Sequence, residues 1–215
     1  MKTRAVAAVN PASPLTLVHW RRAVAEIYAE VRAAKDGADA AARFRAERDR
    51  LFAEHPDTPI HPAQRNHWRG ASWYRYDPKW RTVGVVEPVT PTLTFDIPLA
   101  ADGVIHCTRI ARVRFTVAGK TAALALYWFG GYGGGLWLPF SDATSGDSTY
   151  GGGRYLYDTI KGADLGASAE KLVLDFNFAY NPSCAYDDRW ACPLSPAENS
   201  LPFAVEAGER MPAAV

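Results

Sequence analysis

Hydrophobic positions in the first third of the chain recur at helical spacing. Ser13-Pro14 predicts a helix start, because serine caps free N–H groups and proline suits the first turn. The apolar positions that follow are three or four residues apart and form one stripe, made of Leu17, Trp20, Val24, Ile27, Tyr28 and Val31. Asp36-Gly37 is expected to end this helix. A second helix is predicted over 39–54, and a short helical turn over 62–69.

From about residue 72 the pattern changes to short β-branched and aromatic runs between glycines and prolines. Strands are predicted over 73–76, 82–87, 93–97, 104–117, 122–129, 136–140, 154–158, 171–178 and 202–207. Val113, Phe115 and Val117 alternate with polar positions, which is the period of a half-buried strand. Ala118-Gly119-Lys120 then predicts a hairpin turn.

The order of these elements shows no strand–helix–strand rhythm, so a mostly antiparallel sheet is expected. We predict a β-dominated α+β fold, either a β-sandwich or a partly open barrel, with two N-terminal helices packed on it. The predicted organisation is a loose N-terminus over 1–12, a helical segment over 13–70 and a β-rich core over 71–215. The helices and the core are expected to fold as one unit.

Composition narrows the classes of function. The chain has 215 residues, of which 48% are hydrophobic and 22% charged, and its net charge is +1. This balance does not favour a broad surface for nucleic acid or for an anionic membrane. No secretory signal and no stretch of about twenty apolar residues is visible, so a cytoplasmic location is expected. The three cysteines are therefore expected to be thiols.

Several familiar motifs are missing from the sequence. It has no phosphate-loop pattern, no Gly-x-Ser-x-Gly, no His-x-x-x-His and no Cys-x-x-Cys. No metal and no cofactor are therefore expected. A histidine-dependent nucleophile would require His61, His67 or His106 to fold back over the sheet, because the glycine-rich stretch described next contains no histidine.

A polar, glycine-rich stretch covers residues 141–155. Arginine offers a planar set of donors for carboxylate or phosphate, and glycines let backbone N–H groups approach a ligand. We expect Arg154 to bind an anion and Thr149 or Tyr150 to donate or orient a proton. The ligand-binding candidates are Asp142, Thr144, Gly151, Gly152 and Gly153. Two alternatives remain: Asp142, Thr144 and Asp147 only shape the loop, or Arg154 pairs with Asp142 or Asp175.

The predicted strand at 171–178 places Asp175 and Asn177 on the face opposite its apolar positions. If that face lines a cleft, Asp175 is a candidate general base and Asn177 an orienting amide. If it faces bulk water, both side chains are simply solvated. Asn181, which follows, is a further ligand-binding candidate.

Two loops leave their roles open. Residues 130–135 carry Tyr132 among glycines and suit either a flexible turn or a mobile lid over a ligand. Cys184 and Cys192 suit buried thiols, a disulfide or a reactive thiol. A metal site there would have to recruit Cys107 and His106.

Several motifs closely resemble a bacterial family known as domain of unknown function 1684. The resemblance is carried by Asp142-Ala143-Thr144, Thr149-Tyr150-Gly151, Gly153-Arg154-Tyr155-Leu156, Asp175-Phe176-Asn177, Ala179-Tyr180-Asn181-Pro182, Cys184-Ala185-Tyr186, Cys192-Pro193-Leu194 and Ala207-Gly208-Glu209. It covers most of 24–210 and is densest over 136–210. It implies no particular reaction, but it places the candidate polar residues inside the family's signature blocks. The glycines of 130–135 depart from the family pattern and suggest a specialised substrate loop.

These observations favour a small-molecule enzyme that performs metal-free acid/base chemistry, a hydrolysis or an elimination, on a polar or anionic metabolite. The alternatives are a non-catalytic β domain that binds a small ligand and, third, a barrel that handles flavin or haem. The expected partner is a small polar or anionic molecule, and a homodimer is one alternative for the oligomeric state. The central expectation is that Arg154 and the Asp175–Asn177 pair open onto one shared hollow.

Overall fold

The computed structural model describes residues 12–99, 103–168 and 170–212. The predicted loose end at 1–12 therefore lies outside the described residues except for Ala12. Within these ranges, no helix is both long enough and apolar enough to cross a membrane.

Two N-terminal helices form where the apolar stripe predicts them. Helix α1 spans Pro14–Ala33, and the Ser13 side chain caps it by accepting from the Thr16 amide at 3.0 Å. Helix α2 spans Gly37–Glu54 and begins two residues earlier than predicted. The reason is that Asp36 acts as its N-cap, with its side chain accepting from the Asp39 amide at 2.9 Å.

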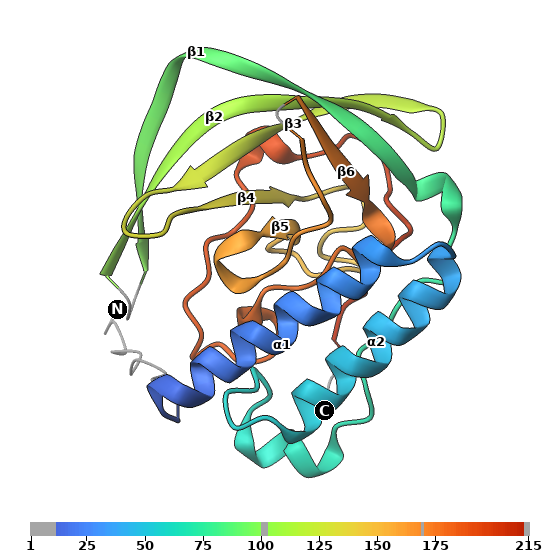
Figure 1. Cartoon of the computed structure of the whole chain (residues 1–215), viewed down its shortest axis with the longest axis vertical. Helices are drawn as coiled ribbons and strands as arrows, with labels where there is room; N and C mark the ends of the chain where they lie inside the picture. The colour runs from blue at the N-terminus through green and yellow to red at the C-terminus, as the bar shows by residue number, and fades with distance from the viewer. Residues whose placement is uncertain (1–11, 100–102, 169, 213–215) are drawn as a thin grey trace.

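The described residues form one antiparallel sheet with the strand order β5-β4-β3-β2-β1-β6. Its strands are β1 (Arg81–Leu99), β2 (Gly103–Val117), β3 (Lys120–Phe129), β4 (Gly135–Phe140), β5 (Arg154–Asp158) and β6 (Lys171–Asp175). The sheet curls into a half-barrel over the core, and the two helices run side by side beneath it (Figure 1). The predicted β-dominated α+β class is confirmed, in its partly open barrel form.

Short 3₁₀ helices punctuate the loops. They span Pro62–His67, Pro78–Trp80, Thr159–Lys161, Phe176–Phe178, Ser183–Ala185 and Ala197–Asn199. The first of these confirms the turn predicted after α2.

Two predicted strands, 82–87 and 93–97, are parts of the one long strand β1. The intervening Pro88 and Pro91 are tolerated because the register with β2 shifts between Pro88 and Leu93. Such an irregularity bends a strand and leaves some of its residues unpaired. Proline is tolerated at such positions because the backbone N–H that it lacks would have no partner there.

Three other strand predictions need correction. Residues 73–76 make no strand, and Trp73 contributes only an isolated bridge to Glu209. Residues 202–207 are irregular, and carbonyl groups of this segment accept hydrogen bonds from the Arg154 side chain instead of from a neighbouring strand. The strand predicted to end at residue 178 ends at Asp175, because its side chain accepts from the Asn177 amide at 3.0 Å and turns the chain into a 3₁₀ helix.

Aromatic side chains join the helices to the sheet. The Phe44 ring of α2 packs against Tyr28 of α1 and Phe178, with centroid distances of 5.4 and 5.1 Å. In the same 3₁₀ helix as Phe178, the Phe176 ring packs against Phe140 of β4 at 5.2 Å. These buried rings fix α1 and α2 beside the end of β6, which is where the candidate site lies.

Candidate functional site

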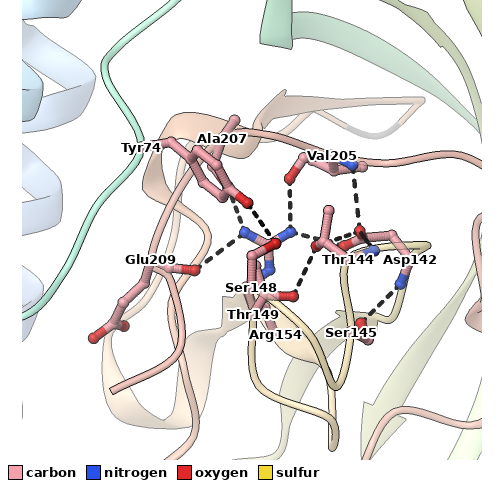
Figure 2. A network of polar contacts seen from close by, with 10 residues as sticks. All are labelled: Tyr74, Asp142, Thr144, Ser145, Ser148, Thr149, Arg154, Val205, Ala207 and Glu209. Atoms are coloured by element: carbon pink, nitrogen blue, oxygen red, sulfur yellow. Dashed lines mark hydrogen bonds and ion pairs between the residues drawn. The ribbon is translucent and has the colours of Figure 1, made fainter. Parts of the chain in front are cut away.

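Arg154, at the start of β5, is only 1% exposed and lies inside a polar network (Figure 2). Its Nη2 donates to Asp142 Oδ2 at 2.7 Å and to the Val205 carbonyl at 3.0 Å. Its Nη1 donates to the Glu209 carbonyl at 3.2 Å and to the Ala207 carbonyl. Burial lowers the pKa of Arg154, and the Asp142 carboxylate opposes that effect. Both terminal nitrogens are therefore already committed to protein acceptors.

The rest of this network shapes the loop after β4. Asp142 Oδ1 accepts from the Thr144 amide at 2.8 Å and from the Thr144 hydroxyl at 2.6 Å. The Thr144 and Thr149 hydroxyls are 2.8 Å apart, and Ser148 accepts from the Tyr74 hydroxyl at 2.9 Å. Together with Arg154, these contacts fasten residues 205–209 to the loop, as Figure 2 shows. Of the alternatives that the sequence left open, the structure has the Arg154–Asp142 pair and the loop-shaping network.

Packing explains two of the three glycines before Arg154, whereas a Cβ added at Gly151 would come no closer than 3.6 Å to its neighbours. At Gly153, where φ is +86°, an added Cβ would lie 2.6 Å from Ser195 Cβ and 2.7 Å from the Phe140 carbonyl. At Gly152, it would lie 2.9 Å from Leu194. The Gly152 carbonyl accepts from the Ser195 amide at 3.1 Å. These glycines thus allow residues 193–196 to approach closely, rather than leaving space for a ligand.

Asp175 has different surroundings from Arg154. Its side chain is 4% exposed, and its Oδ1 accepts from the side-chain amide of Asn177 at 2.9 Å. Asn177 in turn exchanges two hydrogen bonds with the backbone of Asp77. Asp175 Oδ2 lies 3.7 Å from Arg81 Nε, since the β1–β6 register pairs these two residues. Asn177 therefore holds one oxygen of the Asp175 carboxyl group in place.

A pocket of about 660 Å³ opens beside Asp175. It lies between the C-terminal end of α1, the start of α2, strands β1 and β6, and residues 165–168, and we call it the α1–β6 pocket. Figure 1 shows the end of β6 directly beside the end of α1. Basic side chains dominate its charged lining, and they are Arg32, Lys35, Arg81 and Lys171. The excess of positive charge in the lining favours an anionic ligand.

Two side chains that line the α1–β6 pocket, Asp175 and Tyr76, have raised pKa values. Burial raises the pKa of Asp175, with Asn177 and Arg81 opposing the shift. Burial also raises the pKa of Tyr76, so its hydroxyl stays protonated and can donate. This hydroxyl packs on Gly37, where an added Cβ would lie 1.9 Å from it. A carboxyl group of raised pKa and a phenol donor thus face the same space.

The expected hollow shared by Arg154 and Asp175 is not what the structure has. Asp175 lines the α1–β6 pocket, whereas Arg154 is enclosed by backbone carbonyls and Asp142. The reason is that Arg154 sits on β5 and Asp175 on β6, at opposite edges of the sheet. The sequence prediction also missed Arg81 and Lys171. Lys171 has the same two-residue phase as Asp175, which is the signal that would have found it.

The remaining candidates are dispersed. Tyr132 is fully exposed at the tip of the 130–134 loop. The Tyr150 hydroxyl lies 3.5 Å from the Cys184 sulfur. Asn181 is buried, donates to the Arg210 carbonyl at 2.7 Å, and lines a small cavity of about 60 Å³ together with Tyr28 and Arg48. In the part of the chain that the structure describes, no group of three or more His, Cys, Asp or Glu side chains is arranged to hold a metal ion.

Comparisons with known proteins identify a family but name no activity. A family model described as "Protein of unknown function (DUF1684)" matches residues 66–210. The solution NMR structure of an uncharacterized protein from Haloarcula marismortui is similar to this chain, with 35% sequence identity and a TM-score of 0.57. The match covers 77% of this chain and 89% of that one. No curated protein matches the chain. Arg81, Lys171 and Asp175 lie inside the family match, whereas Arg32 and Lys35 precede it.

Proposed function

The chain belongs to the DUF1684 family of proteins of unknown function, and from this premise we propose that it binds a small anionic metabolite in the α1–β6 pocket and exchanges a proton with it through Asp175. The observation that carries the proposal is the Arg81–Asp175 pair. It places a cation and a buried carboxyl group side by side on the wall of a basic pocket.

Arg81 is suited to anion recognition. Its side chain is 53% exposed, and its contact with Asp175, at 3.7 Å, is longer than a hydrogen bond. Most of its guanidinium donors therefore stay available for a carboxylate or a phosphate group. Lys35 and Lys171 lie exposed at the pocket and add attraction that salt would screen.

Asp175 is suited to proton transfer. One oxygen is held by Asn177, so the other is directed toward Arg81 and the pocket. Since burial raises the pKa of Asp175, the proton is held at higher pH than by an exposed aspartate. A carboxyl group in this state can act as a general acid or base in a hydrolysis or an elimination. The Tyr76 hydroxyl supplies a second hydrogen-bond donor, for negative charge that develops on the substrate or on its leaving group.

The anion-binding part of the proposal is tested by calorimetric titration with phosphate, citrate and succinate. We expect at least one of these anions to bind, and Arg81→Gln and Lys171→Gln each to weaken it about tenfold, which corresponds to about 1.4 kcal/mol. Arg114→Gln is the matched control, because Arg114 pairs with Glu87 on the sheet and is absent from the α1–β6 pocket lining. No binding at millimolar concentration, or equal effects of all three variants, would contradict the proposal.

The proton-transfer part is tested by measuring proton uptake on binding, in buffers of different ionisation enthalpy. An anion next to Asp175 should raise its pKa further, so that binding takes up a proton. Asp175→Asn should abolish this uptake and any turnover, and it should leave the free energy of unfolding at pH 7 unchanged or higher, because it removes a buried charge. If the wild type binds without proton uptake, the pocket is a non-catalytic binding site. The predicted cytoplasmic location and homodimer stay predictions.

A further inference from the structure

Cys184 and Cys192 lie together although eight residues separate them. The backbone amide of Cys184 donates to the Cys192 sulfur at 3.3 Å. The Cys184 side chain also contacts the Cys192 side chain, so the two sulfurs are neighbours. Both residues are partly exposed and both are free thiols in the structure. This placement brings the two side chains together, which is what a reversible disulfide first requires.

The surroundings of Cys192 stabilise a thiolate. The neighbouring Cys184 thiol lowers the pKa of Cys192, and Lys161 and the amides of Ser183 and Cys184 act in the same direction against burial. Lys161 is half-exposed beside Asp158, at 3.7 Å from its carboxylate. The phenols of Tyr150 and Tyr155 also lie close enough to the two sulfurs to interact with them. A thiolate held by N–H donors and a cation is the nucleophilic form of cysteine.

Cys184 has the complementary character. Its interaction with Cys192, together with burial, raises the pKa of Cys184, so it remains a protonated thiol. The Tyr150 hydroxyl lies 3.5 Å from its sulfur and helps to hold it in place. One thiolate beside one thiol is the arrangement in which the first attacks and the second resolves.

We propose that Cys192 and Cys184 form a thiol–disulfide exchange site for small-molecule disulfides. The Cys192 thiolate attacks one sulfur of a disulfide RSSR; a Cys192–SR bond forms, the RS–SR bond breaks, and RS⁻ leaves and takes a proton from solvent. Cys184 then gives up its proton to solvent and attacks the Cys192 sulfur, which expels the second RS⁻, and this anion in turn takes a proton from solvent. The protein dithiol is oxidised by two electrons to a Cys184–Cys192 disulfide, and RSSR is reduced to two RSH.

This site is separate from the proposed anion site. Neither cysteine, nor Tyr150, nor Lys161 lines the α1–β6 pocket. Cys107 provides an internal control, because it is fully buried on β2 and burial raises its pKa to about 12. The two late cysteines should therefore differ in chemistry from the third cysteine of the same chain.

The test treats the full chain with glutathione disulfide at pH 6.5 and identifies the products by mass spectrometry of the intact protein and its peptides. We expect wild type to form the Cys184–Cys192 disulfide and Cys184→Ser to stop at a mixed disulfide of Cys192 with glutathione. Cys192→Ser should react at least tenfold more slowly, since only about 1% of an ordinary thiol is ionised at this pH. A Cys107→Ser variant should behave as wild type.

A second measurement keeps the proposal independent of variant folding. In the wild-type protein, iodoacetamide at pH 6.5 should label Cys192 at least tenfold faster than Cys184 or Cys107, and unfolding in urea should remove this difference. Equal labelling of Cys192 and Cys184 in the folded protein would overturn the proposal. So would a Cys184→Ser protein that gives no glutathione adduct at Cys192.

Discussion

The guanidinium of Arg154 connects its own strand to residues 205–209, and the carbonyls that accept its hydrogen bonds belong to an irregular segment. These carbonyls are used by a side chain, so they are not available for a β-ladder, which explains why the strand predicted over 202–207 does not form. The side chain of Arg154 thus connects two parts of the fold, and both of its terminal nitrogens have protein acceptors.

Asp142→Asn tests this structural role. It would leave the buried guanidinium without its countercharge, and breaking a buried pair in this way destabilises proteins by about 3–5 kcal/mol. The free energy of unfolding in urea measures the loss. The matched control is Glu87→Gln, which breaks the exposed pair with Arg114 and should change stability by less than about 1 kcal/mol. An Asp142→Asn protein as stable as the control would contradict the assignment.

Single residues differ in how far the sequence predicts their roles. The alternation of strand positions predicts that Asp175 lies on the polar face of its strand. Whether that face lines a cleft or meets bulk water is left open by the sequence, and the structure has a pocket there. The enclosure of Arg154 has no sequence signal, because its acceptors at 205, 207 and 209 are backbone carbonyls that any residue supplies. From the sequence, a salt bridge of Arg154 with Asp142 is only one alternative to anion binding.

At the scale of elements, local patterns were sufficient where local interactions decide the structure. The turn between β2 and β3 is an example, since Ala118 has φ +48° and Gly119 has φ +75°. Two positive φ values in a two-residue hairpin loop are typical of a type I′ turn, which the Ala-Gly-Lys sequence predicted only as a hairpin. Alanine pays a steric penalty there that asparagine largely avoids.

Ala118→Asn should therefore stabilise the protein by about 0.5–1 kcal/mol, as Asn-Gly is the preferred sequence for this turn. Urea denaturation gives the size of the effect. Nothing would lie within 4 Å of a Cβ added at Gly119, so Gly119→Ala isolates the backbone strain and should destabilise. A neutral or destabilising Ala118→Asn would show that packing at the turn outweighs its backbone conformation.

Elements that depend on distant partners were less predictable. The sequence predicts two strands within β1, at 82–87 and 93–97, because prolines separate the two hydrophobic segments. Pairing with β2 on both sides of the register shift joins them into one strand. Residues 176–178 keep the apolar alternation of a strand, yet the side chain of Asp175 bends them into a 3₁₀ helix. In both cases a tertiary or side-chain contact overrides the local pattern.

At the scale of the whole molecule, the α1–β6 pocket depends on the packing of the helices against the end of β6. Arg32 and Lys35 come from the helical segment, and Arg81, Lys171 and Asp175 come from the sheet. No local pattern joins these parts, because tertiary contacts such as that of Phe44 with Phe178 bring the helices to the sheet. The family match begins at residue 66, so the helical wall of the pocket lies outside it.

The most direct test of the anion pocket is chemical-shift mapping of the ¹⁵N-labelled wild-type chain with whichever of phosphate, citrate or succinate binds most tightly. We expect saturable shifts in the amides of Arg81, Gly166, Val173 and Asp175, around the α1–β6 pocket. The amides of 149–154 should stay unchanged, since Arg154 has its acceptors already. Saturable shifts centred on 149–154, or no saturable shifts with any of the three anions, would contradict the account.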